Sequence, residues 1–149
     1  MKIEKETLLN SNAQKIWDLI LDPVVMGECV PGMQSIEVIT PDEYVSTMVV
    51  KISFITAKFK IRTFVVEKNP PFYLLSEGVG EDSSIASTLS QRSEIFLESL
   101  DPHSTQLRMR VDVDVLGRIG SFGLSAMRTK ADRLWEEFVS NLNSKIQAF

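Results

Sequence analysis

The chain of 149 residues has the length of one domain, and its net charge of −4 argues against nucleic-acid binding, which usually requires a basic excess. The single cysteine, Cys29, excludes an internal disulfide and fits a reducing compartment. No apolar run approaches the ~18 residues of a membrane span, and the acidic, polar N-terminus differs from a signal peptide. The sequence therefore predicts one soluble, cytoplasmic domain over residues 1–149.

The first thirty residues predict one strand followed by two short helices. Lys2 to Leu9 alternates polar and apolar residues, as a strand with one face in water does. Residues 13–21 form a short amphipathic pattern, and Asp22-Pro23 ends it because proline disfavours helical geometry in the preceding residue. Residues 24–30 are expected to add one further helical turn.

From Met33 onward the hydrophobic pattern has a period of two, which indicates consecutive strands. Short polar turns separate these strands, so we expect an antiparallel meander. The last strand alternates most clearly, with apolar residues from Leu107 to Val115 on one face and charged residues on the other. The predicted strands span residues 33–39, 44–55, 58–68, 72–77, 85–97 and 105–116.

The C-terminal stretch predicts one long helix. Residues 124–149 contain neither proline nor glycine, and their apolar residues recur at steps of three and four. A helix over about residues 120–147 is roughly 40 Å long and needs a large apolar surface to lie on. The element order predicts an α+β helix-grip fold: a curved antiparallel sheet of about seven strands wrapped on the C-terminal helix, with two short helices after the first strand.

Residues that could carry catalysis or bind a metal are scarce. The only histidine, His103, falls in a predicted turn, and Cys29 has no cysteine or histidine near it in sequence, so no zinc pattern is present. Nucleophile elbows, phosphate loops and dinucleotide fingerprints are absent from the sequence. We therefore predict no catalytic residue, no metal and no cofactor, and expect a protein that is not an enzyme in its own right.

The apolar residues of the expected concave face form either a filled core or the lining of a groove, and the sequence leaves both interpretations open. Methionine side chains adapt to irregular apolar guests, which favours a groove for an elongated or flat apolar molecule. We expect its entrance near Gly117–Gly123, interpreted as a flexible hinge, and near Val24–Pro31. The predicted lining comprises Met26, Val30, Met48, Val50, Ile52, Phe54, Phe59, Ile61, Leu74, Leu89, Met109, Val111, Val113, Phe122, Met127, Ala131 and Trp135.

Three motifs together resemble the family of the G subunit of carbon monoxide dehydrogenase. The first runs from Trp17 through Asp22-Pro23 to the Cys-Val-Pro-Gly-Met sequence of residues 29–33. The second is Glu-Lys-Asn-Pro-Pro at residues 67–71, and the third extends from Val111 to Gly123. The resemblance covers nearly the whole chain, and the family belongs to the START-like, polyketide-cyclase and birch-pollen-allergen (SRPBCC) superfamily.

The resemblance implies a helix-grip fold with an apolar cavity between the sheet and the terminal helix. It implies a non-catalytic binder of a lipid or quinone-like molecule, accessory to a molybdenum hydroxylase of the carbon monoxide dehydrogenase type, with peripheral membrane contact. One alternative is a polyketide cyclase/aromatase-like or hydrolytic enzyme that holds its substrate through Ser87, Thr63 or Tyr44. Another is a pure protein-interaction factor. The expected oligomeric state is a monomer or a homodimer.

Overall fold

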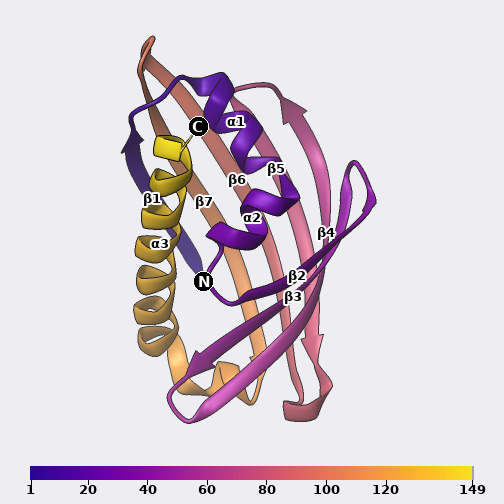
Figure 1. The fold of residues 1–149 in the computed structure, drawn as a ribbon. Helices are drawn as coiled ribbons and strands as arrows, with labels where there is room; N and C mark the ends of the chain where they lie inside the picture. Colours follow the sequence, from indigo (N-terminus) through magenta and orange to yellow (C-terminus); the bar gives the residue numbers. More distant parts are fainter. Residues whose placement is uncertain (149) are drawn as a thin grey trace.

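A computed structural model describes residues 1–148 and shows a curved antiparallel sheet of seven strands beside a long C-terminal helix (Figure 1). This confirms the predicted helix-grip fold. The strands are β1 (Lys2–Leu9), β2 (Met33–Thr40), β3 (Glu43–Ile52), β4 (Ile55–Asn69), β5 (Tyr73–Asp82), β6 (Ser87–Asp101) and β7 (Ser104–Gly117). The helices are α1 (Ala13–Ile20), α2 (Pro23–Cys29) and α3 (Gly123–Ala148), with short 3-10 turns η1 (Ser83–Ile85) and η2 (Ile119–Phe122).

The strand order β1-β7-β6-β5-β4-β3-β2 places the first strand beside the last. β2 to β7 form the predicted meander, each strand antiparallel to the next. Helices α1 and α2 carry the chain from β1 at one edge to β2 at the other, and they cover the upper part of the concave face (Figure 1). The sheet curls strongly enough for the lower end of β3 to reach α3.

The boundary between β3 and β4 differs from the prediction. The sequence pattern continued one strand to residue 55, but β3 ends at Ile52 and Ile55 pairs with it across a two-residue turn. Ser53 adopts a positive φ of 55° in this turn. The predicted placement of Phe54 on the concave face is therefore wrong: a tight hairpin reverses the chain there and turns the ring outward, leaving it 77% exposed.

Local capping explains where the short helices begin. The Asn12 side chain accepts a hydrogen bond from the Lys15 amide at 2.8 Å and caps α1. The Asp22 carboxylate accepts from the Val24 and Val25 amides at 2.9 and 3.4 Å and caps α2, which has proline as its first residue. The Asp22-Pro23 pair thus ends α1, as predicted, and also starts α2.

The buried core consists of two separate clusters. The upper cluster joins α1, α2 and the C-terminal part of α3 to the ends of β6 and β7, and includes Ile16, Trp17 and Leu142. The lower cluster centres on Phe59 and Ile119 and joins β4 to η2. Partly buried apolar residues, among them Trp135 and Val115, pack against the two clusters, so the concave face is not buried uniformly.

Close packing accounts for two of the three glycines at the junction between β7 and α3. Gly117 has a φ of 91°, and a Cβ there would lie 1.9 Å from the Ala86 carbonyl oxygen. A Cβ on Gly120 would lie 2.3 Å from the Val115 carbonyl oxygen. These contacts replace the interpretation of this stretch as a flexible hinge: the backbone needs glycine here because neighbouring backbone approaches so closely.

Candidate functional site

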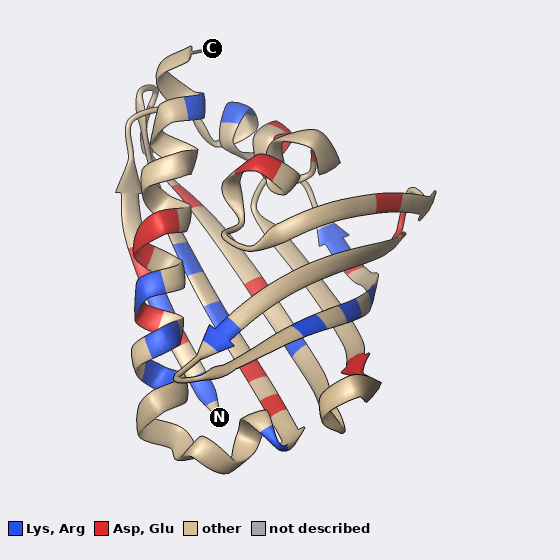
Figure 2. Cartoon of the chain, turned by 60° about the horizontal axis from the view of Figure 1, so that its bottom comes forward, with Lys and Arg blue, Asp and Glu red and all other residues tan. Residues whose placement is uncertain are grey.

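Polar contacts hold α3 against the β1 edge of the curled sheet. The Lys5 ammonium of β1 pairs with Asp132, and the Arg128 guanidinium donates to the Lys2 carbonyl oxygen at 3.1 Å. Basic and acidic residues alternate in bands along the helix (Figure 2). Because α3 contacts β1, β3, α2 and η2, it bridges the open side of the curled sheet.

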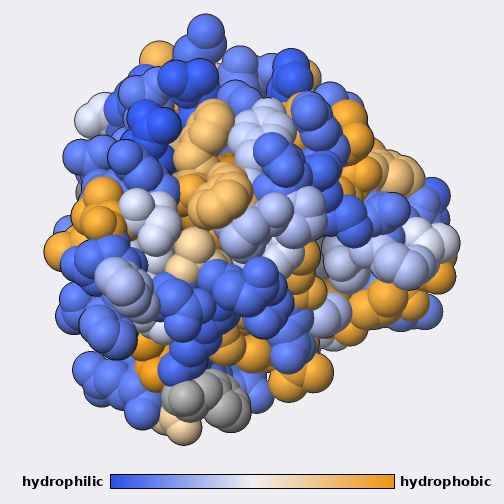
Figure 3. Space-filling view, turned by 90° about the horizontal axis from the view of Figure 1, so that it is seen from above, coloured by the Kyte–Doolittle hydropathy of each residue, from blue (hydrophilic) through white to orange (hydrophobic). Residues whose placement is uncertain are grey.

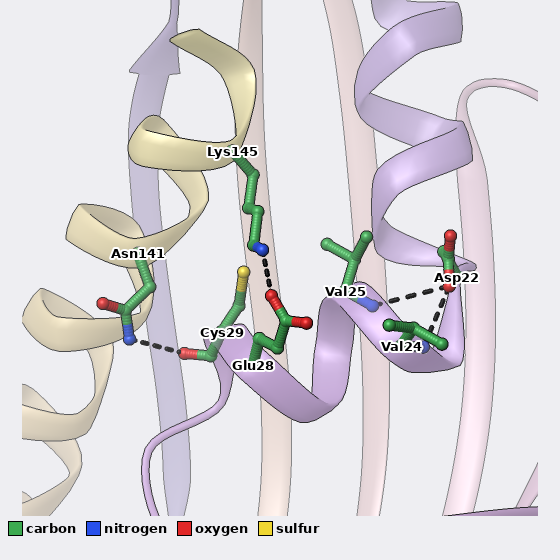
Figure 4. A network of polar contacts seen from close by, with 7 residues as sticks. All are labelled: Asp22, Val24, Val25, Glu28, Cys29, Asn141 and Lys145. Carbon is green, nitrogen blue, oxygen red and sulfur yellow. Dashed lines mark hydrogen bonds and ion pairs between the residues drawn. The ribbon is translucent and has the colours of Figure 1, made fainter. Parts of the chain in front are cut away.

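The C-terminal half of α3 is tied to α2. Asn141 donates from Nδ2 to the Cys29 carbonyl oxygen at 3.0 Å, and the Lys145 ammonium pairs with the Glu28 carboxylate (Figure 4). Both contacts are made at the C-terminal end of α2, whereas Asp22 caps its other end. They fix the upper end of α3, where the upper cluster is sealed.

The middle of α3 and the strand surface it covers are only half-buried. Met127 near one end of the helix and Leu142 and Ile146 near the other are buried, whereas Ala131, Leu134, Trp135 and Phe138 between them keep accessible surface. On β7, Leu107 is buried but Met109, Val111 and Val113 are half-buried. These side chains therefore keep accessible apolar surface, and we call the region between the middle of α3 and β7 the groove.

A pocket of about 170 Å³ lies on the same concave face, between α1–α2 and strands β2 to β5. Its lining is mainly apolar: Ile20, Leu21, Pro23, Met26, Met33, Ile36, Val65 and Leu74, with the polar residues Tyr44, Ser46, Thr63 and Ser76. Figure 3 views the molecule from above and shows hydrophobic side chains among hydrophilic ones at that end. The pocket is thus an apolar site that reaches the sheet.

A larger hollow of about 570 Å³ lies on the outer face of the sheet. Its lining is mixed: the charged residues Lys60, Arg62, Glu81 and Asp114 stand beside apolar residues such as Val45, Val79 and Leu116. An apolar guest gains less from this mixed lining than from a mainly apolar one, because the charged groups keep their water. The smaller pocket inside the grip is therefore the better candidate for binding a hydrophobic molecule.

A band of four polar residues connects the pocket to the groove. Thr63 and Gln91 flank Gly78 in one cross-strand row, and Ser76 faces Ser93 in the next row. The rows on either side are apolar, with Leu74, Ile95 and Met109 above and Ile61, Leu89 and Val115 below. The two rows of this polar band end on β7 at Val113 and Val111, which belong to the groove. The pocket and the groove therefore lie on one continuous stretch of the inner sheet surface.

The predicted lining residues fall into three groups. Half-buried residues of the concave face are Met26 in the pocket and Met109, Val111, Val113, Ala131 and Trp135 in the groove, whereas Leu74 lines the pocket as a buried member of the upper cluster. Those packed in or against the lower cluster or the helix ends are Phe59, Ile61 and Met127, which are buried, and Val30, Met48, Val50, Ile52 and Leu89, which are half-buried. Phe54 and Phe122 lie at the lower end of the molecule, with ring centroids 5.6 Å apart at 81°.

The structure changes the roles of two residues considered for a cyclase. Ser87 is 2% exposed, and its hydroxyl donates to the Ile85 carbonyl oxygen at 3.2 Å and accepts from the Ile119 amide at 3.1 Å. The Tyr44 hydroxyl donates to the Pro41 carbonyl oxygen at 3.0 Å. Both hydroxyl groups therefore stabilise turns, and Thr63 is the residue of the three that belongs to the polar band.

Sequence reasoning missed Ser76, Gln91 and Ser93. A signal was present in β6, where the inward positions run Leu89, Gln91, Ser93, Ile95 and Leu97 and the apolar alternation breaks at two successive places. A polar residue at an expected core position is unfavourable unless it has a partner or a function. The interruption of the apolar alternation at Gln91 and Ser93 therefore marks the part of β6 that belongs to the site.

Cys29 is expected to be unreactive in the native protein. Its side chain is fully buried, and burial raises the pKa of the thiol above its ordinary value, which the nearby Lys145 offsets in part. At pH 8 we expect iodoacetamide to leave the folded protein unmodified and to alkylate it rapidly in guanidinium chloride, as measured by intact mass. Equal rates in both conditions would contradict this prediction, and a Cys29→Ser variant controls for reaction elsewhere.

Among residues 1–148, no three histidine, cysteine, aspartate or glutamate side chains come together as metal ligands would. None of the helices in that range is long and apolar enough to cross a membrane. The pocket lining offers burial of apolar surface, with neutral hydrogen-bonding groups on the sheet.

Comparison with known families agrees with this architecture. The family model for the G subunit of carbon monoxide dehydrogenase (CoxG) matches residues 7–147. The chain belongs to the CoxG family. This confirms the resemblance found in the sequence motifs, and the match includes the helices, every strand from β2 to β7 and nearly all of α3. A search of curated proteins by sequence finds no match for this CoxG-family chain.

Solved structures resemble this CoxG-family protein over almost its whole length. A conserved protein from Geobacillus kaustophilus has 21% identity and a TM-score of 0.87, covering 99% of this chain and 96% of its own. A START superfamily protein from Mycobacterium smegmatis has 14% identity and a TM-score of 0.79, covering 99% and 97%. The Zhui aromatase/cyclase from Streptomyces sp. R1128 has 12% identity and a TM-score of 0.71, covering 99% and 93%. At these identities the similarity shows the START-like fold.

Proposed function

We propose that this CoxG-family protein is a non-catalytic binder of a hydrophobic small molecule, held in the groove and the adjoining pocket between the sheet and α3. The observation that carries the proposal is the half-buried apolar surface in the middle of the grip, on α3 at Ala131 and Trp135 and on β7 at Met109 to Val113. A lipid or quinone-like molecule has the length and the apolar character that this surface suits.

The energetics favour an elongated or polycyclic guest. Burying ~200 Å² of ligand surface at about 25 cal/mol per Å² contributes ~5 kcal/mol before the costs of association. A small apolar molecule therefore binds weakly, and useful affinity requires a guest that spans both the pocket and the groove. Mass spectrometry under native conditions, together with organic extraction of the purified protein, tests for such a guest. Protein that consistently carries no extractable lipid and binds no added apolar probe would contradict the proposal.

Filling the groove from α3 should abolish binding. Ala131 is a half-buried residue at the centre of the inward side of the helix, so Ala131→Trp places an indole where the guest is proposed to lie. We expect the affinity for N-phenyl-1-naphthylamine, measured by its fluorescence, to fall about tenfold or more, because the indole occupies the volume that the guest needs.

Thr129→Trp is the matched control, since it adds the same indole to an exposed position of α3 two residues away. It should leave probe binding within about twofold of the original chain, because surface substitutions rarely perturb a distant site. Equal loss of binding in both variants, or retention in both, would contradict a guest site beneath the middle of α3.

The family suggests the physiological setting. The name of the CoxG family refers to carbon monoxide dehydrogenase, and we propose that this chain acts as an accessory to a molybdenum hydroxylase of that type. Co-purification of the enzyme with the tagged chain tests the association. Retention of the enzyme by the Ala131→Trp variant would favour the alternative of a pure interaction factor, and loss of the enzyme would link the association to the occupied groove.

One structural neighbour is an aromatase/cyclase, which makes a cyclase-like enzyme the alternative function. Thr63 is the residue of the polar band that such an enzyme would use to hold a polar group of its substrate. Turnover of an aromatic polyketide mimic that is abolished by Thr63→Val would overturn the non-catalytic proposal. We expect no turnover with either protein.

A further inference from the structure

The side-chain amide of Gln91 occupies space that a glycine leaves open. Gly78 faces Gln91 across β5 and β6 and faces Thr63 across β4 and β5. A Cβ on Gly78 would lie 2.9 Å from Gln91 Nε2 and 3.4 Å from Thr63 Oγ1. Both polar atoms therefore lie next to the same point on the inner surface of the sheet. This arrangement is possible because residue 78 has no side chain.

In the side-chain amide of Gln91, the oxygen has a hydrogen-bonding partner and the nitrogen has none within residues 1–148. The Ser93 hydroxyl donates to Gln91 Oε1, which orients the amide with its NH₂ group on the other side. Residues 1–148 offer no acceptor to Nε2, and within them no fully enclosed side-chain nitrogen or oxygen lacks a partner. Nε2 of the half-buried Gln91 is therefore open to accessible space and is available as a donor.

Charged groups stay away from this donor. The charged neighbours of the band along β5 and β6, Glu77, Arg92 and Glu94, alternate onto the outer face of the sheet. Lys5 lies at the β1 end of the inner face, but its ammonium is paired with Asp132. An anionic guest would lose its hydration here without gaining a free counter-charge, whereas a neutral acceptor needs only the hydrogen bond.

We infer that the site selects apolar molecules carrying a neutral hydrogen-bond acceptor, such as a carbonyl oxygen, and that the Gln91 NH₂ group donates to it with Thr63 beside it. The inference rests on the proposed function and adds the class of ligand to it. The apolar rows on either side of the polar band bury the body of the guest. The polar band determines where the guest lies along the groove, because the guest's hydrogen-bond acceptor would be buried without a donor anywhere else.

Two probes of nearly equal size separate the contribution of the carbonyl from that of the apolar body. 2-Acetylnaphthalene and 2-ethylnaphthalene share the ring system and differ in the ketone oxygen. Titration of ¹⁵N-labelled protein by NMR gives the affinity for each probe and follows the Gln91 side-chain NH₂ resonances directly. We expect those resonances to shift with the ketone and to move little with the hydrocarbon.

Gln91→Met removes the amide but keeps an unbranched side chain of similar length. We expect it to weaken the ketone about three- to tenfold, the usual effect of one lost hydrogen bond, and to leave the hydrocarbon within about twofold. Arg92→Met is the matched control on the outward face of the same strand and should change neither affinity. If Gln91→Met fails to fold, Gly78→Ala tests the same donor, since its Cβ displaces the amide and should weaken the ketone selectively.

The outcomes separate this inference from the proposed function. If neither these probes nor N-phenyl-1-naphthylamine binds the original chain and the purified protein carries no extractable lipid, the proposed function fails and the inference with it. If the larger probe binds but the ketone binds no more tightly than the hydrocarbon, the function stands and the selection of a carbonyl is wrong. If both probes bind and the amide substitution affects them equally or not at all, the function stands and the selection of a carbonyl is wrong. Selective weakening of the ketone supports both.

Discussion

Gly117→Ala should destabilise the protein by roughly 3–5 kcal/mol, the largest effect that we expect from a single substitution. The new methyl group would lie 1.9 Å from the Ala86 carbonyl oxygen, a distance at which backbone must move. The φ of 91° adds strain for any residue with a Cβ. Because Ser87 pairs with Gly117 and its hydroxyl also accepts a hydrogen bond from the Ile119 amide, the displacement would reach the lower cluster. Urea denaturation followed by circular dichroism measures the loss of unfolding free energy.

Gly123→Ala provides the control for backbone strain alone. Gly123 also has a positive φ, 87°, but a Cβ there meets nothing within 4 Å. Its substitution should cost about 1–3 kcal/mol, the effect of an unfavourable φ without a clash. Equal destabilisation by the two substitutions would show that contact with Ala86 is unimportant at position 117 and would restore the interpretation of this junction as a flexible hinge.

Leu142→Ala should destabilise the protein by about 3 kcal/mol, the second large effect. Leu142 is 0% exposed and lies in the upper cluster with residues of α1 and α2 such as Ile16 and Cys29. Truncation removes apolar contacts from three helices at once and leaves a cavity that polar contacts around it keep from collapsing. For a chain of this length the melting temperature should fall by about 6–12 °C, measured by differential scanning calorimetry.

Leu124→Ala makes the same chemical change on the same helix at a residue that is 59% exposed. It should change the unfolding free energy by less than about 0.5 kcal/mol, because little buried surface is lost. Because alanine has a slightly higher helix propensity than leucine, propensity cannot account for a loss in either variant. A similar loss of stability from both substitutions would therefore contradict the assignment of the Leu142 effect to burial in the upper cluster.

The element order and the layer arrangement follow from patterns within the sequence. A period of two from Met33 to Val115, interrupted by short polar turns, can only be satisfied by consecutive strands with one apolar face. The period of 3.6 after Gly123 requires a long amphipathic helix, and Asp22-Pro23 fixes the break between the two short helices. These features depend on local geometry, which each segment carries in its own residues.

Only the tertiary structure decided which inward residues are sealed and which remain accessible. Met127 and Met109 carry the same side chain on predicted inward faces, but the first is buried at the start of α3 and the second is half-buried on β7, because the helix bridges the edges of the sheet. The convergence of Gln91 and Thr63 over Gly78 likewise depends on the register of β4, β5 and β6. Strand register joins residues far apart in the chain, so the spacing along any one strand does not contain it.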